Sequence, residues 1–181
     1  EGQNNTAAGS YSLYANTTGN ANNGIGYKAL YRNTTGRNNT ANGNSALYNN
    51  TTGENNAAFG YKTLYSNTSG TNNTGFGTNA LANNTTGQFN SAFARNALLF
   101  NTIGSYNVAQ GSAALFNNVS GSNNIAIGYG SGFSNTAGSD NVFLGKRAGY
   151  FETGDSKLYI ANNKTTPLIY GEFSKVASQN R

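Results

Sequence analysis

The sequence lacks several residue types on which much protein chemistry depends. It has no cysteine, histidine, methionine or tryptophan, a single proline, and only 9% charged residues. Without cysteine there is neither a disulfide framework nor a thiolate metal site, and without histidine the usual catalytic base at neutral pH is missing. The low charge and the single proline argue against a disordered tail or a proline-rich linker. We therefore expect an ordered protein that is not an enzyme and holds no cofactor or metal.

The sequence also lacks long runs of apolar residues and long runs of charge. No apolar stretch approaches the roughly 18 residues of a membrane span, and no signal peptide is visible. The net charge of +5 is scattered along the chain and indicates nucleic-acid binding only weakly. We expect no membrane insertion within this segment and no nucleic-acid partner. Because the chain begins at Glu1 already in phase with its repeat, we also expect it to be a piece of a longer protein.

The sequence is instead rich in asparagine, with 34 residues, and in glycine, with 24, and these follow a repeat of 17 residues. With glycine as position 1, nine repeats begin at Gly2, Gly19, Gly36, Gly53, Gly70, Gly87, Gly104, Gly121 and Gly138. Position 8 is glycine except at Ala94, position 6 is small until Phe143, and position 12 is leucine in the first seven repeats. Position 13 is mostly aromatic, and position 15 is asparagine in the first eight repeats. Such regularity predicts a solenoid.

Each repeat is too short for two helices but suits two short strands and two turns. We expect one strand at positions 4 to 7 and another at about positions 9 to 13, with a bend at the glycine of position 8. An Asn-Thr-Thr-Gly turn closes each coil. Stacked coils pair each strand with its copies in parallel sheets. Positions 6 and 12 are predicted to fill the interior, and positions 5, 7, 11 and 13 to face outward.

The outward position 7 forms a long apolar column, which a monomer rarely leaves in water. We expect this column to be buried by self-association, as a parallel homotrimer. A wider monomeric coil with position 7 inside is the alternative. The predicted trimer-interface residues are Ile25, Phe59, Phe76, Phe93, Ile127 and Leu144.

The repeat changes toward the C-terminus. Gly132 and Gly149 replace leucine at position 12, and the composition shifts after Gly154. We expect a solenoid over residues 1–154 and a small β cap or transition segment over residues 155–181, with strand-like runs at 157–160 and 168–170.

Parts of the repeat resemble a known family. Asn123-Asn124-Ile125-Ala126-Ile127-Gly128 and Asn22-Asn23-Gly24-Ile25-Gly26 resemble the repeat unit of YadA-like trimeric autotransporter adhesin heads. The longer unit, Ala-Leu-Tyr followed by Asn-Thr-Thr-Gly, resembles tail-fibre-type repeats that often precede a cleaved chaperone of the endosialidase type. The resemblance implies a left-handed parallel β-roll, a homotrimer, and an extracellular, cell-surface or virion-fibre location. The coil here is longer than that of the adhesin heads, so their turn geometry does not transfer.

From these features we expect a segment of a trimeric surface or tail-fibre adhesin that binds a cell-envelope receptor, preferably a glycan. Outward tyrosines could contact sugars, and asparagine amides could bond to hydroxyl groups. The glycan-binding candidates are Tyr27, Tyr31, Tyr48, Tyr61 and Tyr65. A passive spacer that carries a separate receptor-binding tip is the alternative, and an ice-binding solenoid with aligned threonines is a minor one.

Three carboxylates near the end of the repeat could in principle form a glycosidase acid pair: Asp140, Glu152 and Asp155. We expect them instead to be solvated charges near the cap.

Overall fold

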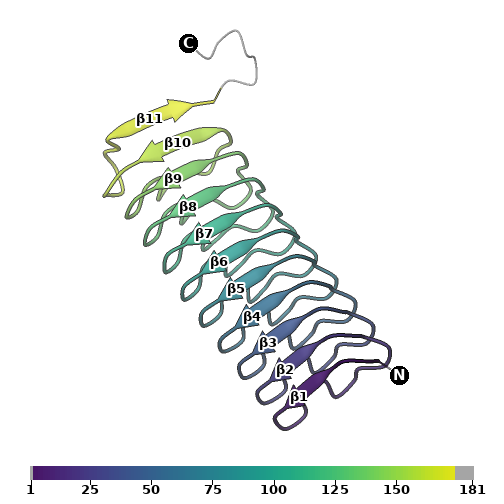
Figure 1. The fold of residues 1–181 in the computed structure, drawn as a ribbon. Helices are drawn as coiled ribbons and strands as arrows, with labels where there is room; N and C mark the ends of the chain where they lie inside the picture. The colour runs from purple at the N-terminus through teal and green to yellow at the C-terminus, as the bar shows by residue number, and fades with distance from the viewer. Residues whose placement is uncertain (1, 174–181) are drawn as a thin grey trace.

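The computed structural model describes residues 2–173 and shows a β-solenoid in which every coil contributes one strand (Figure 1). The described residues form one sheet in chain order, with β1 to β10 parallel and β11 antiparallel to β10. The strands are β1 (Thr6–Ala8), β2 (Asn23–Ile25), β3 (Thr40–Asn42), β4 (Ala57–Phe59), β5 (Thr74–Phe76), β6 (Ser91–Phe93), β7 (Val108–Gln110), β8 (Ile125–Ile127), β9 (Val142–Leu144), β10 (Lys157–Ile160) and β11 (Ile169–Glu172). The predicted all-β parallel solenoid of 17-residue coils, with a β pair at its C-terminal end, is confirmed. The last part of the predicted cap segment, residues 174–181, lies outside the described residues.

Each of the strands β1 to β9 is only three residues long and covers positions 5 to 7 of its coil. The register places every residue beside its copy one repeat away, so that Ala41 lies between Gly24 and Ala58. Position 6 points into the solenoid, and Ala41, Ala58 and Ala92 are fully buried there. The leucines of position 12 also lie in the apolar interior, as the sequence predicts.

The prediction of a second strand at positions 9 to 13 is wrong. Residues at positions 10 and 12 have left-handed backbones, for example Lys62 and Leu64, both with φ of 52°. This region is a turn, and its left-handed residues break the alternation of a strand, so that positions 11 and 12 both point inward. Position 11, predicted to face outward, is therefore buried, as Ala46 and Thr63 show. Leucine rarely adopts a positive φ, so a pattern of residue types gives no sign of this turn.

Glycine occupies position 1 of every coil and position 8 of all coils except that of Ala94, because the stacked coils approach each other closely there. Gly128 at position 8 has φ of 126°, and a Cβ atom on it would lie 2.6 Å from the carbonyl of Gly145 in the next coil. A Cβ atom on Gly53 at position 1 would lie 2.5 Å from the carbonyl oxygen of Gly70. At these two glycines, a side chain would force adjacent coils apart.

Asparagine at position 15 forms a buried ladder along the rod. The Nδ2 group of Asn67 donates to Oδ1 of Asn50 at 2.7 Å, and Asn84 donates in turn to Asn67 at 2.8 Å. Each of these asparagines also donates to the carbonyl of the glycine three residues later, as Asn67 does to Gly70 at 3.0 Å. Buried amides of this kind are stabilising only when their hydrogen bonds are made. The sequence had indicated turn residues here, whereas the side chains belong to the interior.

A second asparagine ladder occupies position 4. The Oδ1 atom of Asn56 accepts the backbone N–H of Asn73 at 3.0 Å, and its Nδ2 donates to the carbonyl of Gly70 at 2.9 Å. The Gly70 carbonyl thus accepts one amide from each ladder. In each of the first eight coils, the two asparagines thus join the start and the end of the coil through the first glycine of the next coil.

The irregular last coils have a buried apolar interior like that of the regular ones. Phe143 replaces the small residue of position 6 and is fully buried. Its ring occupies the space beside Gly132 and Gly149, where Cβ atoms would clash with it. The loss of leucine from position 12 and the gain of phenylalanine at position 6 therefore compensate each other.

The β10–β11 pair continues the solenoid beyond β9. Tyr159 of β10 lies beside Phe143, with ring centroids 6.0 Å apart, and its hydroxyl donates to Glu152 at 2.8 Å. Lys157 and Glu172 form an ion pair across β10 and β11 at 2.5 Å. Aromatic and charged side chains thus cover the C-terminal end of the apolar interior.

Candidate binding surfaces

The outer face of the sheet carries the apolar column that the sequence predicts at position 7. Of the predicted interface residues, Phe76 has the largest exposed fraction, 54%, and Phe59 and Leu144 are half-buried. The rings of Phe59 and Phe76 stack at 5.0 Å, and those of Phe76 and Phe93 at 6.5 Å. Ile25 and Ile127 are exposed on the same face. The alternative with position 7 inside the coil is wrong for this chain.

The apolar face is wider than the sequence analysis suggested. Position 5 lies on the same face and becomes apolar toward the C-terminus, at Val108, Ile125 and Val142. The register then places Leu158 beside Val142 and Ile160 beside Leu144. These residues could have been found from the alternation of positions 5 and 7 in each strand. We call the residues at positions 5 and 7, with Leu158 and Ile160, the sheet face.

The tyrosines predicted to bind glycans lie on the edge of the rod that follows the strand ends. Tyr31 and Tyr48 at position 13 are half-buried in a stacked column, with centroids 5.1 Å apart, and Tyr65 stacks on Tyr48 at 5.0 Å. Tyr27 and Tyr61 at position 9 are more exposed. The structure therefore brings the five candidates to one edge.

Cations lie over several of these rings. The Nζ atom of Lys28 is 5.1 Å from the Tyr27 ring and 5.5 Å from the Tyr31 ring. Lys62 repeats this arrangement with Tyr61 at 5.3 Å and Tyr65 at 5.5 Å. A hydrogen bond with Tyr27 raises the pKa of Lys28, so its ammonium group is charged at neutral pH.

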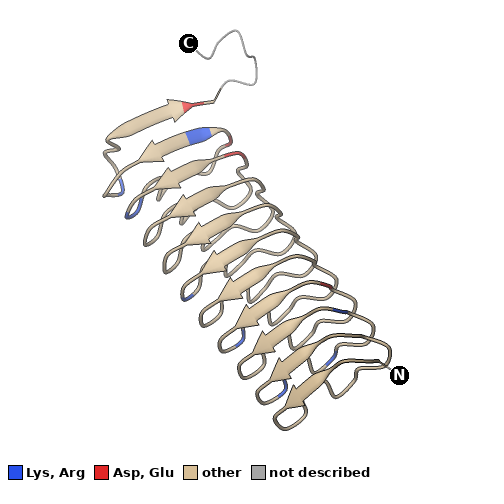
Figure 2. Cartoon of the chain, in the orientation of Figure 1, with Lys and Arg blue, Asp and Glu red and all other residues tan. Residues whose placement is uncertain are grey.

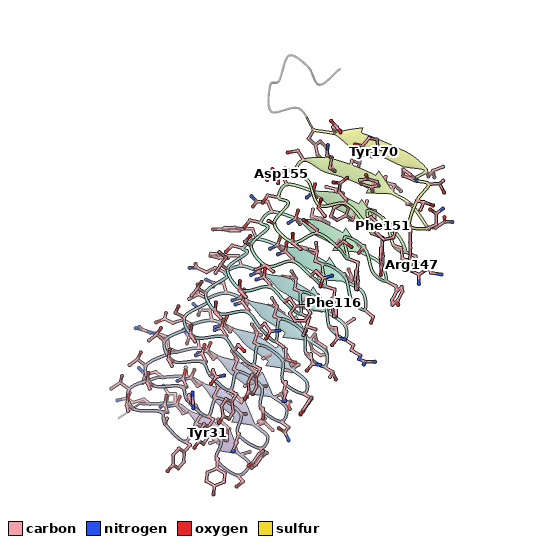
Figure 3. The ribbon with its side chains drawn as sticks, turned by 180° about the vertical axis from the view of Figure 1, so that it is seen from behind. Tyr31, Phe116, Arg147, Phe151, Asp155 and Tyr170 are labelled. Atoms are coloured by element: carbon pink, nitrogen blue, oxygen red, sulfur yellow. The ribbon has the colours of Figure 1, made fainter. Side chains whose placement is uncertain are left out.

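Further toward the C-terminus, the same edge holds Arg147 against aromatic rings. Its guanidinium carbon is 5.6 Å from the Tyr129 ring and 6.0 Å from the Tyr150 ring. Lys164, in the loop between β10 and β11, approaches the Tyr150 ring to 4.4 Å. Figure 3 shows Arg147 and Phe151 on this edge and Asp155 on the opposite one. The sequence analysis named none of these cations.

The three carboxylates considered for catalysis lie at hydrogen-bonded or turn positions of the solenoid. Asp155 accepts the backbone N–H of Ser139 at 2.8 Å and ends a ladder of serines at position 2, in which Ser122 accepts from Ser105 and Ser139 from Ser122. Asp140 lies in the left-handed turn of position 3, with φ of 59°.

Glu152 takes the place of asparagine at position 15 in the last coil, beyond the Asn-to-Asn bonds of the ladder, which run from Asn16 to Asn118. Its Oε1 accepts the backbone N–H groups of Thr153 at 3.0 Å and Gly154 at 2.8 Å. Burial alone would raise the pKa of Glu152, but these bonds and that of Tyr159 lower it below its ordinary value. A general acid needs a raised pKa, so this carboxylate is poorly suited to that role.

The threonine column of position 16 is also committed to internal bonds. The hydroxyls of Thr34, Thr51 and Thr68 donate to carbonyls of the next coil at 3.0, 3.0 and 3.1 Å. A regular outward array of free hydroxyl donors is therefore not formed by this column, which weakens the ice-binding alternative.

Within residues 2–173 no group of three or more acidic side chains is placed to hold a metal ion, and no helix has the length and apolarity needed to span a bilayer. One strand per 17-residue coil, a leucine interior and two buried asparagine columns define a β-solenoid repeat protein with asparagine ladders. No family model, curated protein or solved structure matches the chain.

Proposed function

We propose that this chain is a rod segment of an extracellular, cell-surface or virion fibre, and that it self-associates as a homotrimer through its sheet face. In this assembly the outer edges bind a cell-envelope glycan, which makes the rod part of an adhesin. The observation that carries the proposal is the apolar sheet face, which continues from Phe59 in β4 to Ile160 in β10.

The sheet face is suited to association along its length. Its side chains stand on short parallel strands in register, so the columns of successive coils run along the rod axis. Burying exposed apolar surface stabilises an assembly by roughly 25 cal/mol per Å². Contiguous apolar surface of this kind marks an interface in soluble proteins.

The choice of three copies rests on the resemblance of the repeat to YadA-like heads and tail-fibre-type repeats. Asn42 and Gln110 interrupt the apolar column at position 7. In a parallel trimer each would meet its own copies near the shared axis, where amides can bond to one another.

A passive spacer is the second candidate, because the interior of the coils is so uniform. In that role the rod would hold a separate receptor-binding tip away from its base. A glycan array probed with this chain separates the two roles. Binding that Tyr→Ala changes at Tyr27 or Tyr61 reduce supports the adhesin, whereas silence on the array supports the spacer.

The assembly is tested by placing a charge on the sheet face. We expect Phe76→Asp to shift the sedimentation coefficient toward that of one 18.9 kDa chain, because it sets carboxylates against each other in a buried interface. Phe89→Asp is the matched control, since Phe89 is also exposed, at 44%, but lies in the position 3 turn. If the two variants sediment alike, the sheet face is not the interface.

A further inference from the structure

The charged residues of the coils are divided between two edges of the rod. Positions 9, 10, 13 and 14, which are exposed or half-buried in most coils and which we call the basic edge, contain no acidic residue in any of the nine coils. Their cations are Lys28, Arg32, Lys62, Arg95, Lys146 and Arg147. Arg37, the remaining basic residue of the coils, is at position 2 and lies 2.9 Å from Glu54. Figure 2 shows several blue segments on the loops beyond the strand arrowheads and others on β10 and on the far side of the first coils.

Aromatic rings hold four of these cations in place without neutralising them: Lys28, Arg32, Lys62 and Arg147. Lys28 and Lys62 each lie over one ring of position 9 and one of position 13, at 5.1 to 5.5 Å. Arg32 lies over the Tyr48 ring at 5.7 Å. Cation–π contacts orient the charge and leave it free to meet an anion. Lys28 and Lys62 are two coils apart, which is roughly 9.6 Å at the spacing of paired strands.

The stacked rings limit what the edge can bind. Tyr31 has Tyr14 on one face at 5.2 Å and Tyr48 on the other at 5.1 Å. Phe133 is covered in the same way by Phe116 at 5.0 Å and Tyr150 at 4.8 Å. Single-stranded nucleic acid is held by stacking bases on open aromatic faces, which these columns do not offer. Around these columns, the basic edge presents phenol hydroxyls, amides and cations.

We propose that the basic edge binds a linear acidic polysaccharide lying along the rod axis. Its carboxylates would meet the ammonium and guanidinium groups, and its hydroxyls would bond to phenols and amides. From Lys28 in the second coil to Arg147 in the ninth, the edge runs for seven coil steps, or roughly 34 Å. This inference rests on the proposed adhesive role and names its ligand. The edge lies beyond the strand ends, so it stays open when the sheet face is buried (Figure 2).

The test is direct binding of polygalacturonate, a polymer of uronic acid, to the whole chain. We expect saturable binding that weakens as NaCl is added, because exposed ionic contacts are screened by salt. Uncharged dextran should not compete. The double change Lys28→Gln and Lys62→Gln should weaken binding by about tenfold, because it removes two charge-assisted contacts.

Arg37→Gln is the matched control, since it removes a cation from the other edge, and it should leave the affinity within about twofold. No binding, equal competition by dextran, or equal loss in both variants would overturn the inference. Preference for single-stranded DNA over polygalacturonate would overturn it in favour of a nucleic-acid site. The oligomeric state is measured separately. A trimer that does not bind polygalacturonate would support the spacer role. A monomer that binds it would contradict the proposed trimer but not the proposed ligand.

Discussion

The interior and the exterior of this solenoid differ in how strictly they repeat. Inside, leucine stacks on leucine and asparagine bonds to asparagine, so a change in one coil disturbs the coil on each side. Outside, position 7 varies from isoleucine to asparagine to phenylalanine, and cations occur in only some coils. The difference indicates that the constant interior accounts for the stability of the rod, whereas the variable exterior can be adapted to partners.

Phe143 gives the sharpest test of the interior. We expect Phe143→Ala to lower the free energy of unfolding by about 3–5 kcal/mol, because it leaves a cavity beside two glycines. Adding Gly132→Leu and Gly149→Leu should recover most of this loss by restoring the regular pattern. Urea denaturation followed by circular dichroism measures each step.

The exterior control for that series is Phe89→Ala, which removes an exposed ring stacked on Tyr106 at 5.0 Å. We expect a loss of about 1 kcal/mol or less. Equal losses at Phe143 and Phe89 would contradict the contrast between interior and exterior.

The asparagine ladder should give the next largest effect. Asn67→Ala removes the bonds to Asn50 and Gly70 and the bond accepted from Asn84, and it leaves buried polar atoms without partners. We expect a loss of about 1–3 kcal/mol in the same denaturation assay. Asn49→Ala, at a half-buried position outside the ladder, should cost about 0.5 kcal/mol or less. A ladder variant as stable as Asn49→Ala would show that the amide column is dispensable.

The smallest effect is expected in acid, at Glu152 in the last coil. The folded-state pKa of Glu152 lies below its ordinary value of 4.5, so its carboxylate stabilises the fold above that value. This stability is lost as the pH falls through the lowered pKa. Glu152→Gln should therefore show a weaker decline in melting temperature below pH 4.5 than the unchanged protein. Identical acid profiles would mean that the bonds of Glu152 do not affect stability.

The parts of the fold that repeat in sequence are those that could be predicted from it. The nearly constant residues of positions 6 and 12 predict an interior location, because each stacks on its own copies there. Position 7 is predicted to face outward because side chains alternate along a strand. The turn at positions 10 to 12 could not be predicted, since Leu64 with a positive φ has no signature in residue type.

Two further features, the asparagine ladder of position 4 and the basic edge, could have been predicted from the sequence but were not. Asparagine occupies position 4 in all nine coils, from Asn5 to Asn141, a regularity that local turn propensity does not require. The basic edge becomes visible only when charges are arranged by repeat position, since Lys28, Lys62 and Arg147 are far apart along the chain. The compensation between the large Phe143 and its two glycines required the coordinates, because Gly149 lies in the same coil as Phe143 and Gly132 in the coil before it.

The most direct test of the central claim is the mass of the unchanged chain in solution by light scattering. Self-association through the sheet face predicts a mass near three times the chain mass of 18.9 kDa, independent of dilution over the working range. A mass near 18.9 kDa would contradict the trimer and show that the sheet face remains exposed to solvent.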